Sequence, residues 1–150
     1  MSANRRSQVL EPFLACGVDL MEVSRFEREL ARRGGGLVEE LLGPGELAWC
    51  RRRRRACEGY AMAFAAKEAL FKALGTGMVG RMTWRDIAIA WPEGAARPTM
   101  TLTGETAAAA AGMGVHGVHV AVAATRAHAV AWVVLEAWGC DASGLRRATA

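Results

Sequence analysis

The sequence contains few residues of several kinds, and each scarcity excludes a class of protein. With only 4 prolines in 150 residues and no glycine period, a collagen-like or linker protein is excluded. No stretch approaches about 18 consecutive apolar residues, so no membrane-spanning helix is expected. The beginning, MSANRRSQVLEPFLACGVD, reaches an acid instead of a small-residue cleavage site. We therefore predict a cytoplasmic protein.

The cysteines also lack the spacing of a metal or redox site. None of the 4 forms a C-x-x-C pair with another, so neither a thioredoxin-like motif nor a structural zinc site is supported. We expect reduced thiols at these four positions: Cys16, Cys50, Cys57 and Cys140.

What is present is the composition of one globular domain, 52% hydrophobic and 23% charged. We predict that this domain spans residues 12–138, between flexible tails at 1–11 and 139–150 that are small, polar and aperiodic. The net charge of +4 suggests an acidic partner but falls short of a dedicated nucleic-acid binder. Neither a nucleic acid nor a membrane is expected as a partner.

Helical periodicity dominates the first half of the chain and strand alternation the second. We predict an α+β fold with a largely antiparallel sheet. The expected strands are 13–20, 84–91, 98–103 and a hairpin of 117–124 with 128–135. The expected helices are 23–33, a short turn over 37–42, a stretch from 46 through the arginines 51–55, a long helix over 60–74, and 105–113.

Two acids stand out because their neighbours are apolar. Asp19 lies near the end of the first strand, where it either caps the following helix or serves as a paired or metal-bound carboxylate. Glu68 lies in the long helix with Lys67 beside it and Lys72 four residues on. An exposed Glu68–Lys72 pair would contribute only about 0.3–0.5 kcal/mol, whereas on a helix buried on most sides these charges need partners.

Three further features have ordinary structural explanations. The turn Gly75-Thr76-Gly77 would let a phosphate approach the backbone, but it also suits a helix C-terminus. The run Arg51 to Arg55 is typical of a solvated helix face, and nucleic-acid binding is the alternative. Alternation places His128 on the apolar side of its strand, as a core or interface group.

The order of the motifs is more specific than any one of them. The chain contains GVDLMEVSRF, then FAAKEALFKALGTG, then WRDIAI, then RPTMTL. In this order they resemble the holo-acyl-carrier-protein synthase family of 4′-phosphopantetheinyl transferases, over roughly residues 16 to 136. The resemblance implies that family's fold, an antiparallel sheet packed on a long central helix.

The resemblance also implies an activity and a site. The family transfers 4′-phosphopantetheine from coenzyme A to a serine of an acyl carrier protein of fatty-acid or polyketide synthesis, releasing adenosine 3′,5′-bisphosphate. Asp19 and Glu68 match its two Mg²⁺ ligands. Glu68 or a metal-held water would accept the serine proton. The expected contacts to coenzyme A are Lys67, Lys72, Gly75, Thr76 and Gly77.

Basic residues of the first predicted helix would meet the acidic carrier protein. Arg25 matches the family's arginine there, and Arg28 and Arg32 would extend the same surface. The family assembles as a homotrimer with active sites between neighbouring subunits, so a homotrimer is expected here.

The chain departs from the family pattern at two places. Ala63 stands where members usually carry arginine before FAAKE, and the segment 121–125 reads AVAAT where members carry S-x-S-H or S-x-T-H. An alternative function follows from these losses: a diverged member that docks carrier proteins without catalysing transfer.

Overall fold

The computed structural model describes residues 12–95 and 97–138, so the predicted tails lie outside the described residues. Four helices follow the first strand, and the remaining strands come later, which confirms the predicted α+β class. The elements are β1 (Pro12–Glu22), α1 (Val23–Arg33), α2 (Gly36–Leu41), α3 (Pro44–Arg51), α4 (Ala56–Leu74), the 3₁₀ turn η1 (Trp84–Asp86), β2 (Ile87–Ala90), β3 (Thr99–Leu102), α5 (Gly104–Gly112), β4 (Val115–Ala124) and β5 (His128–Trp138).

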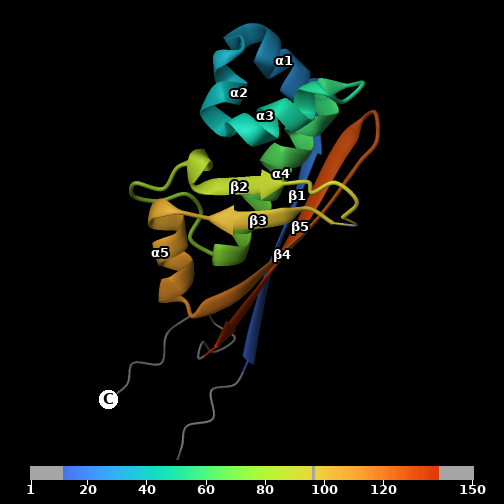
Figure 1. The fold of residues 1–150 in the computed structure, drawn as a ribbon. Helices are drawn as coiled ribbons and strands as arrows, with labels where there is room; N and C mark the ends of the chain where they lie inside the picture. The colour runs from blue at the N-terminus through green and yellow to red at the C-terminus, as the bar shows by residue number, and fades with distance from the viewer. Residues whose placement is uncertain (1–11, 96, 139–150) are drawn as a thin grey trace, which may run out of the picture.

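Two antiparallel sheets frame helix α4. The larger has the strand order β1-β5-β4, and the smaller pairs β2 with β3. Figure 1 shows α1, α2 and α3 gathered at one end of α4, with the small sheet crossing in front of that helix. Within the described residues, no helix is both long and apolar enough to cross a membrane.

The larger sheet has one face against α4 and one face toward solvent. On β5 the buried side chains alternate with exposed ones, as period-two alternation requires. The buried set is Ala129, Ala131, Val133, Leu135 and Ala137. His128 is exposed with Val130 and Trp132, so of the two alternatives predicted for it the core one is wrong, and the interface one stays a prediction.

Helix α4 forms because nearly all of its residues are good helix formers, and it ends where Gly75 adopts a left-handed conformation with φ 74°. Strand β1 crosses this helix closely at Gly17. A Cβ at position 17 would overlap the carbonyl oxygen of Ala69 and lie 2.6 Å from the amide nitrogen of Ala73. The absence of a side chain at Gly17 therefore sets how near β1 comes to α4.

Helix α4 begins at Ala56, four residues before the predicted start at Tyr60. The extension includes Gly59, a residue type that disfavours a helix interior. In the structure Gly59 permits helix crossing, since a Cβ there would lie 3.1 Å from Cys50 Sγ. The arginine run is helical only at Arg51, and Arg55 has an extended backbone ahead of α4. The prediction that α3 continues through this run is wrong.

The predicted strand over 84–91 is also shorter than expected. Trp84–Asp86 forms η1 instead, because the Asp86 carboxylate accepts a hydrogen bond from the Thr83 hydroxyl at 2.9 Å and closes a turn. Trp91 lies beyond β2 and stacks on Trp49, with ring centroids 3.7 Å apart.

We expect Gly17→Ala to destabilise the fold by about 1–3 kcal/mol, because the added methyl group meets backbone atoms that cannot rotate away. Urea unfolding measures the change. Gly36→Ala is the matched control: a Cβ at Gly36 meets nothing within 4 Å, so this variant should be no less stable than the parent chain. Equal unfolding midpoints for the two variants would contradict the tight crossing.

Candidate active site

Asp19 projects from β1 toward α4 and is mostly buried, with 12% of its side chain exposed. Its Oδ1 atom accepts a hydrogen bond from Lys72 Nζ at 2.6 Å. Its Oδ2 atom is buried and has no hydrogen-bond partner among the described residues. Helix α1 is preceded by Glu22 as its N-cap residue, so Asp19 does not cap it. A buried carboxylate oxygen without a partner is costly unless a ligand satisfies it.

Glu68 lies on α4, one turn before Lys72, and is half-buried. Burial raises the pKa of the Glu68 carboxyl, the negative charge of Asp19 raises it further, and the Lys72 ammonium lowers it. The two acids, far apart in sequence, come together in the fold, because Lys72, one helical turn after Glu68, pairs with Asp19 at 2.6 Å. The site thus combines two carboxylates with one ammonium group.

A cleft of about 490 Å³ opens beside these charges, at the C-terminal end of α4. Its wall includes the ring of Trp84, which meets Phe71 edge to face at a centroid distance of 5.3 Å. The lining residues are Glu68, Phe71, Lys72, Gly75, Gly77, Met78 and Trp84. Neither Trp84 nor Phe71 was singled out as a site residue from the sequence.

The Gly75-Thr76-Gly77 turn borders this cleft. Gly75 and Gly77 have positive φ angles of 74° and 66°, a conformation that favours glycine. The Thr76 hydroxyl donates a hydrogen bond to the carbonyl oxygen of Gly77 at 3.0 Å. The turn therefore ends the helix, which confirms the helix C-terminus alternative, and Gly75 and Gly77 line the cleft; the contact to a phosphate stays a prediction.

Lys67 does not join the cleft, although the sequence suggested a contact to coenzyme A. Its side chain is fully buried, and Nζ donates three hydrogen bonds, to the carbonyl oxygens of Leu41 and Trp84 and to Glu46 Oε2. Burial lowers the pKa of Lys67, and the charge of Glu46 opposes this shift. With all three protons used, Lys67 has none left for a ligand, so its role is structural.

Glu46, which the sequence did not single out, completes this buried group. Its Oε2 atom also accepts from the Gly43 amide at 2.6 Å, and its Oε1 atom accepts from the Ile89 amide at 3.0 Å. The bond from Lys67 to the Trp84 carbonyl connects this group to the cleft wall. The available signal was an acid three residues after Gly43, at the start of a helix beginning with Pro44.

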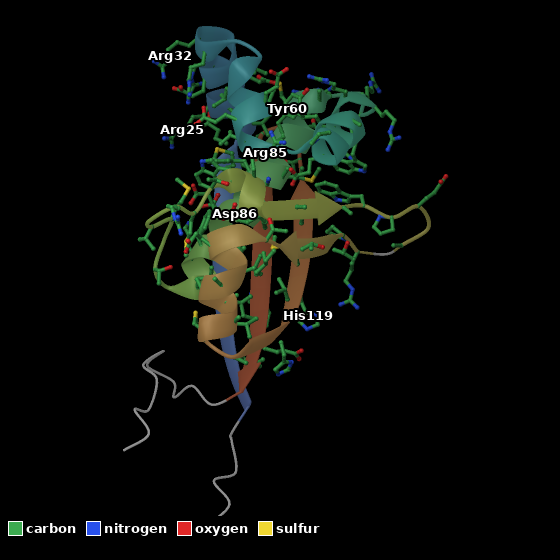
Figure 2. All side chains as sticks on the ribbon, turned by 60° about the vertical axis from the view of Figure 1, so that its left-hand side comes forward. Arg25, Arg32, Tyr60, Arg85, Asp86 and His119 are labelled. Carbon is green, nitrogen blue, oxygen red and sulfur yellow. The ribbon has the colours of Figure 1, made fainter. Side chains whose placement is uncertain are left out.

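Helix α1 carries the arginines expected to meet a partner. Figure 2 shows Arg25 and Arg32 projecting away from the helical end of the molecule. Arg28 donates to the Ser24 hydroxyl at 3.2 Å, and Arg32 pairs with Glu29 at 2.6 Å. Arg25 makes no hydrogen bond or ion pair with any residue that the structure describes, and all three side chains are exposed.

Of the three alanines in segment 121–124, Ala121 and Ala123 lie on the outer side of the sheet, whereas Ala124 pairs with the buried Ala129 and lies on the side of α4. Ala121 and Ala123 are exposed, whereas Val120, directly before them on β4, is buried against the core. Asp19 faces α4, so side chains at 121 and 123 lie on the opposite face of the same sheet. Their replacement leaves the Asp19–Glu68–Lys72 group of this chain intact.

The two carboxylates provide oxygen ligands of the kind that Mg²⁺ prefers, and Mg²⁺ commonly takes only one or two carboxylates with waters and phosphates completing its shell. A nearby cation would give the Asp19 Oδ2 atom, which has no partner among the described residues, a partner and would lower the raised pKa of Glu68. No group of three or more His, Cys, Asp or Glu residues suited to a metal occurs among the described residues. The arrangement fits a magnesium ion that shares its shell with a ligand.

Comparison with known proteins identifies the family. The family model of the 4′-phosphopantetheinyl transferase superfamily matches residues 15–133. The chain belongs to this superfamily. It is 40% identical over 123 residues to the holo-[acyl-carrier-protein] synthase of Koribacter versatilis, covering 82% of this chain and 98% of that protein. It is 44% identical over 121 residues to the synthase of Desulforudis audaxviator, covering 81% and 91%.

The solved structures agree with the fold of this phosphopantetheinyl transferase. The crystal structure of Helicobacter pylori holo-[acyl-carrier-protein] synthase in complex with coenzyme A superposes with a TM-score of 0.69 at 26% identity. The match covers 80% of this chain and 98% of that one. The family expected from the motifs is confirmed, and the chain is a transferase enzyme.

The raised pKa of Glu68 predicts how the stability of this transferase depends on pH. A carboxyl whose pKa is raised in the folded state destabilises the fold at a pH where it is ionised in both the folded and the unfolded state. The penalty is absent below the ordinary value of 4.5, grows as pH rises, and is complete above the folded pKa. With EDTA present, we expect Glu68→Gln to melt at a higher temperature than the parent at pH 7.5, and the gap to close toward pH 4.

Glu93 is a suitable control, because it is exposed and has no ion pair with a described residue. Glu93→Gln should leave the melting temperature unchanged across the same range. A Glu68→Gln variant that melts below the parent at pH 7.5, or a gap that does not vary with pH, would contradict the assignment of a penalised charge at Glu68.

Proposed function

We propose that this chain transfers 4′-phosphopantetheine from coenzyme A to a serine of an apo acyl carrier protein, with Mg²⁺ as cofactor and adenosine 3′,5′-bisphosphate as the second product. The observation that carries the proposal is the convergence of Asp19 and Glu68 beside a cleft, with Lys72 pairing with Asp19 and lining the cleft together with Glu68. The carrier would be one of fatty-acid or polyketide synthesis. The relatives' names as holo-[acyl-carrier-protein] synthases and the coenzyme A complex of one of them support this choice of substrates.

Asp19 and Glu68 would hold the magnesium ion. When bound, Mg²⁺ supplies Lewis-acid neutralisation of the diphosphate charge that builds up on the leaving phosphate. Asp19 suits this role because its Oδ2 atom is buried and no residue of the described part of the chain bonds to it. Glu68 suits it because its charge is otherwise penalised by burial and by Asp19.

The chain's own groups then account for binding and proton transfer. In the reaction the serine oxygen forms a bond to phosphorus, a diphosphate P–O bond breaks, and the serine proton passes to a base. Glu68 or a water held in the site would accept this proton. Lys72 lines the cleft with half of its side chain exposed, where it can face the phosphates. Gly75, Thr76 and Gly77 would place backbone against the nucleotide.

We also propose that Arg25, Arg28 and Arg32 dock the carrier protein. Their exposure and their spacing along α1 form a basic surface, and charge complementarity steers an acidic partner. This surface begins just after β1, the strand that carries Asp19, so a carrier held there lies near the site.

A homotrimer is the proposed assembly, and the outer face of the larger sheet supports self-association. In the centre of this face Trp132 is 54% exposed, and its neighbours across the strands are Val18 and Ala121. The other exposed apolar residues of the face are Leu14, Leu20 and Val130. An exposed apolar patch of this kind marks an interaction surface. The cytoplasmic location stays a prediction.

The transfer reaction is tested by incubating the protein with coenzyme A, Mg²⁺ and apo acyl carrier protein, and weighing the carrier by mass spectrometry. We expect a gain of one phosphopantetheine group. Asp19→Asn should lower kcat by at least about 10²-fold, because charge stabilisation at the reacting phosphate is lost.

Arg25→Ala serves as the control for that assay. Because Arg25 is proposed to dock the carrier, its loss should raise the KM for the carrier and leave kcat near the parent value. If no cognate carrier gains mass, the transfer proposal fails. Calorimetry would then decide for the docking module if the carrier binds while coenzyme A shows no magnesium-dependent binding.

The assembly is tested by sedimentation equilibrium. We expect a mass of three chains of 16.0 kDa for the parent protein and of one chain for Trp132→Glu, because a carboxylate in the centre of the apolar face would be buried unpaired. Glu136→Gln, a change on the same strand that adds no charge, should keep the trimer. A monomeric parent protein would rule out the assembly.

A further inference from the structure

Lysine is rare in this chain, and both lysines lie on helix α4. Of 19 cationic residues, only Lys67 and Lys72 are lysines, and the rest are arginines. Lys67 is buried and uses its three protons within the core. Lys72 is 52% exposed and pairs with Asp19, which is itself mostly buried. The site therefore holds the one solvent-accessible ammonium group among the described residues.

The Lys72 ammonium is the positive charge beside the two acids. Nζ lies 2.6 Å from Asp19 Oδ1 and also donates to the Val18 carbonyl oxygen at 3.2 Å. Glu68 lies one helical turn before Lys72 on the same helix. The ammonium therefore offsets part of the repulsion between the two carboxylates.

The contacts of Asp19 divide between its two oxygens. Oδ1 is taken by Lys72, whereas Oδ2 is buried and has no partner among the described residues. The Lys72 side chain has solvent around half of its surface, so it has room to leave Asp19 without moving the backbone. The pair can open by rotation about side-chain bonds alone.

We propose that Lys72 is an exchangeable counter-ion, which pairs with Asp19 while the site holds no divalent ion and releases it when such an ion binds with a phosphorylated ligand. This inference rests on the proposed function, because it takes Asp19 and Glu68 as the ligands of the ion. It adds a positioning role for Lys72 before the phosphates arrive.

The residue type supports exchange. A guanidinium group binds a carboxylate through two parallel hydrogen bonds and is held firmly, whereas an ammonium group is a compact point charge on a flexible stem. In a chain that uses arginine almost everywhere, lysine at position 72 keeps the pair with Asp19 readily broken.

Exchange also makes the divalent ion and the phosphates help each other. When Asp19 is released, the favourable free energy of the Lys72–Asp19 pair is lost. This loss lowers the affinity of the protein without coenzyme A for the divalent ion. When a diphosphate is present, the released ammonium gains a new partner. Linkage then requires that each ligand tightens the binding of the other.

The test is a titration with Mn²⁺ in place of Mg²⁺, followed by electron paramagnetic resonance at constant pH and without coenzyme A. Lys72→Met should bind Mn²⁺ about fivefold or more tightly than the parent, and Lys72→Arg should bind it more weakly, because the guanidinium holds Asp19 with two bonds. With coenzyme A present, the advantage of Lys72→Met should disappear, because the phosphates have lost their ammonium partner.

The matched control is Arg33→Met, which removes the same charge from a side chain of similar exposure, 46%, paired with Glu40 on the surface. It should not change Mn²⁺ affinity. Circular dichroism checks that each variant is folded. If Asp19→Asn abolishes Mn²⁺ binding but Lys72→Met binds no more tightly than Arg33→Met, the counter-ion role is overturned and the metal site stands. If Asp19→Asn and Glu68→Gln bind Mn²⁺ like the parent, the proposed metal site itself fails.

Discussion

The close crossing of β1 over α4 at Gly17 is the constraint on which the site depends. Backbone atoms of Ala69 and Ala73 fill the space that a side chain would need. Asp19 follows two residues later on the same face of the strand and pairs with Lys72, whose Cβ also lies at the crossing. A larger spacing between strand and helix would separate Asp19 from Glu68. A missing methyl group on one strand thus decides whether two distant acids share a site.

Helix α4 carries two lysine–carboxylate pairs whose different burial gives them different properties. Lys67 and Glu46 are 0% and 3% exposed, and each polar side-chain atom of the pair has at least one hydrogen-bond partner. Breaking a buried ion pair leaves an unpaired charge in a medium of low dielectric constant, so the Lys67–Glu46 pair stays intact. Through the bond from Lys67 to the Trp84 carbonyl, it positions the cleft wall. Lys72 and Asp19 are more exposed, and water can replace the lysine. Burial separates a structural pair from one that can take part in binding.

Much of the fold and of the candidate site was predictable from the sequence because it depends on local sequence pattern. The alanine-rich composition of α4, the left-handed glycine at its end and the alternation of β5 each follow from neighbouring residues. The ordered motifs around Asp19 and Glu68 predicted the family, which the family match confirms. The errors arose where a distant contact overrides a local preference. Gly59 reads as a helix breaker but serves a helix crossing, and Asp86 turns the chain where alternation predicted a strand.

The sequence by itself determined the fold class, the family and the two acids, because these depend on residue identity and order along the chain. Only the tertiary structure decided which cations join them. Lys67 and Lys72 are both charged residues of one helix, and nothing local tells them apart. Lys67 points into the core and bonds to Glu46, whereas Lys72 bonds to Asp19. The difference arises because different elements pack against the two faces of α4.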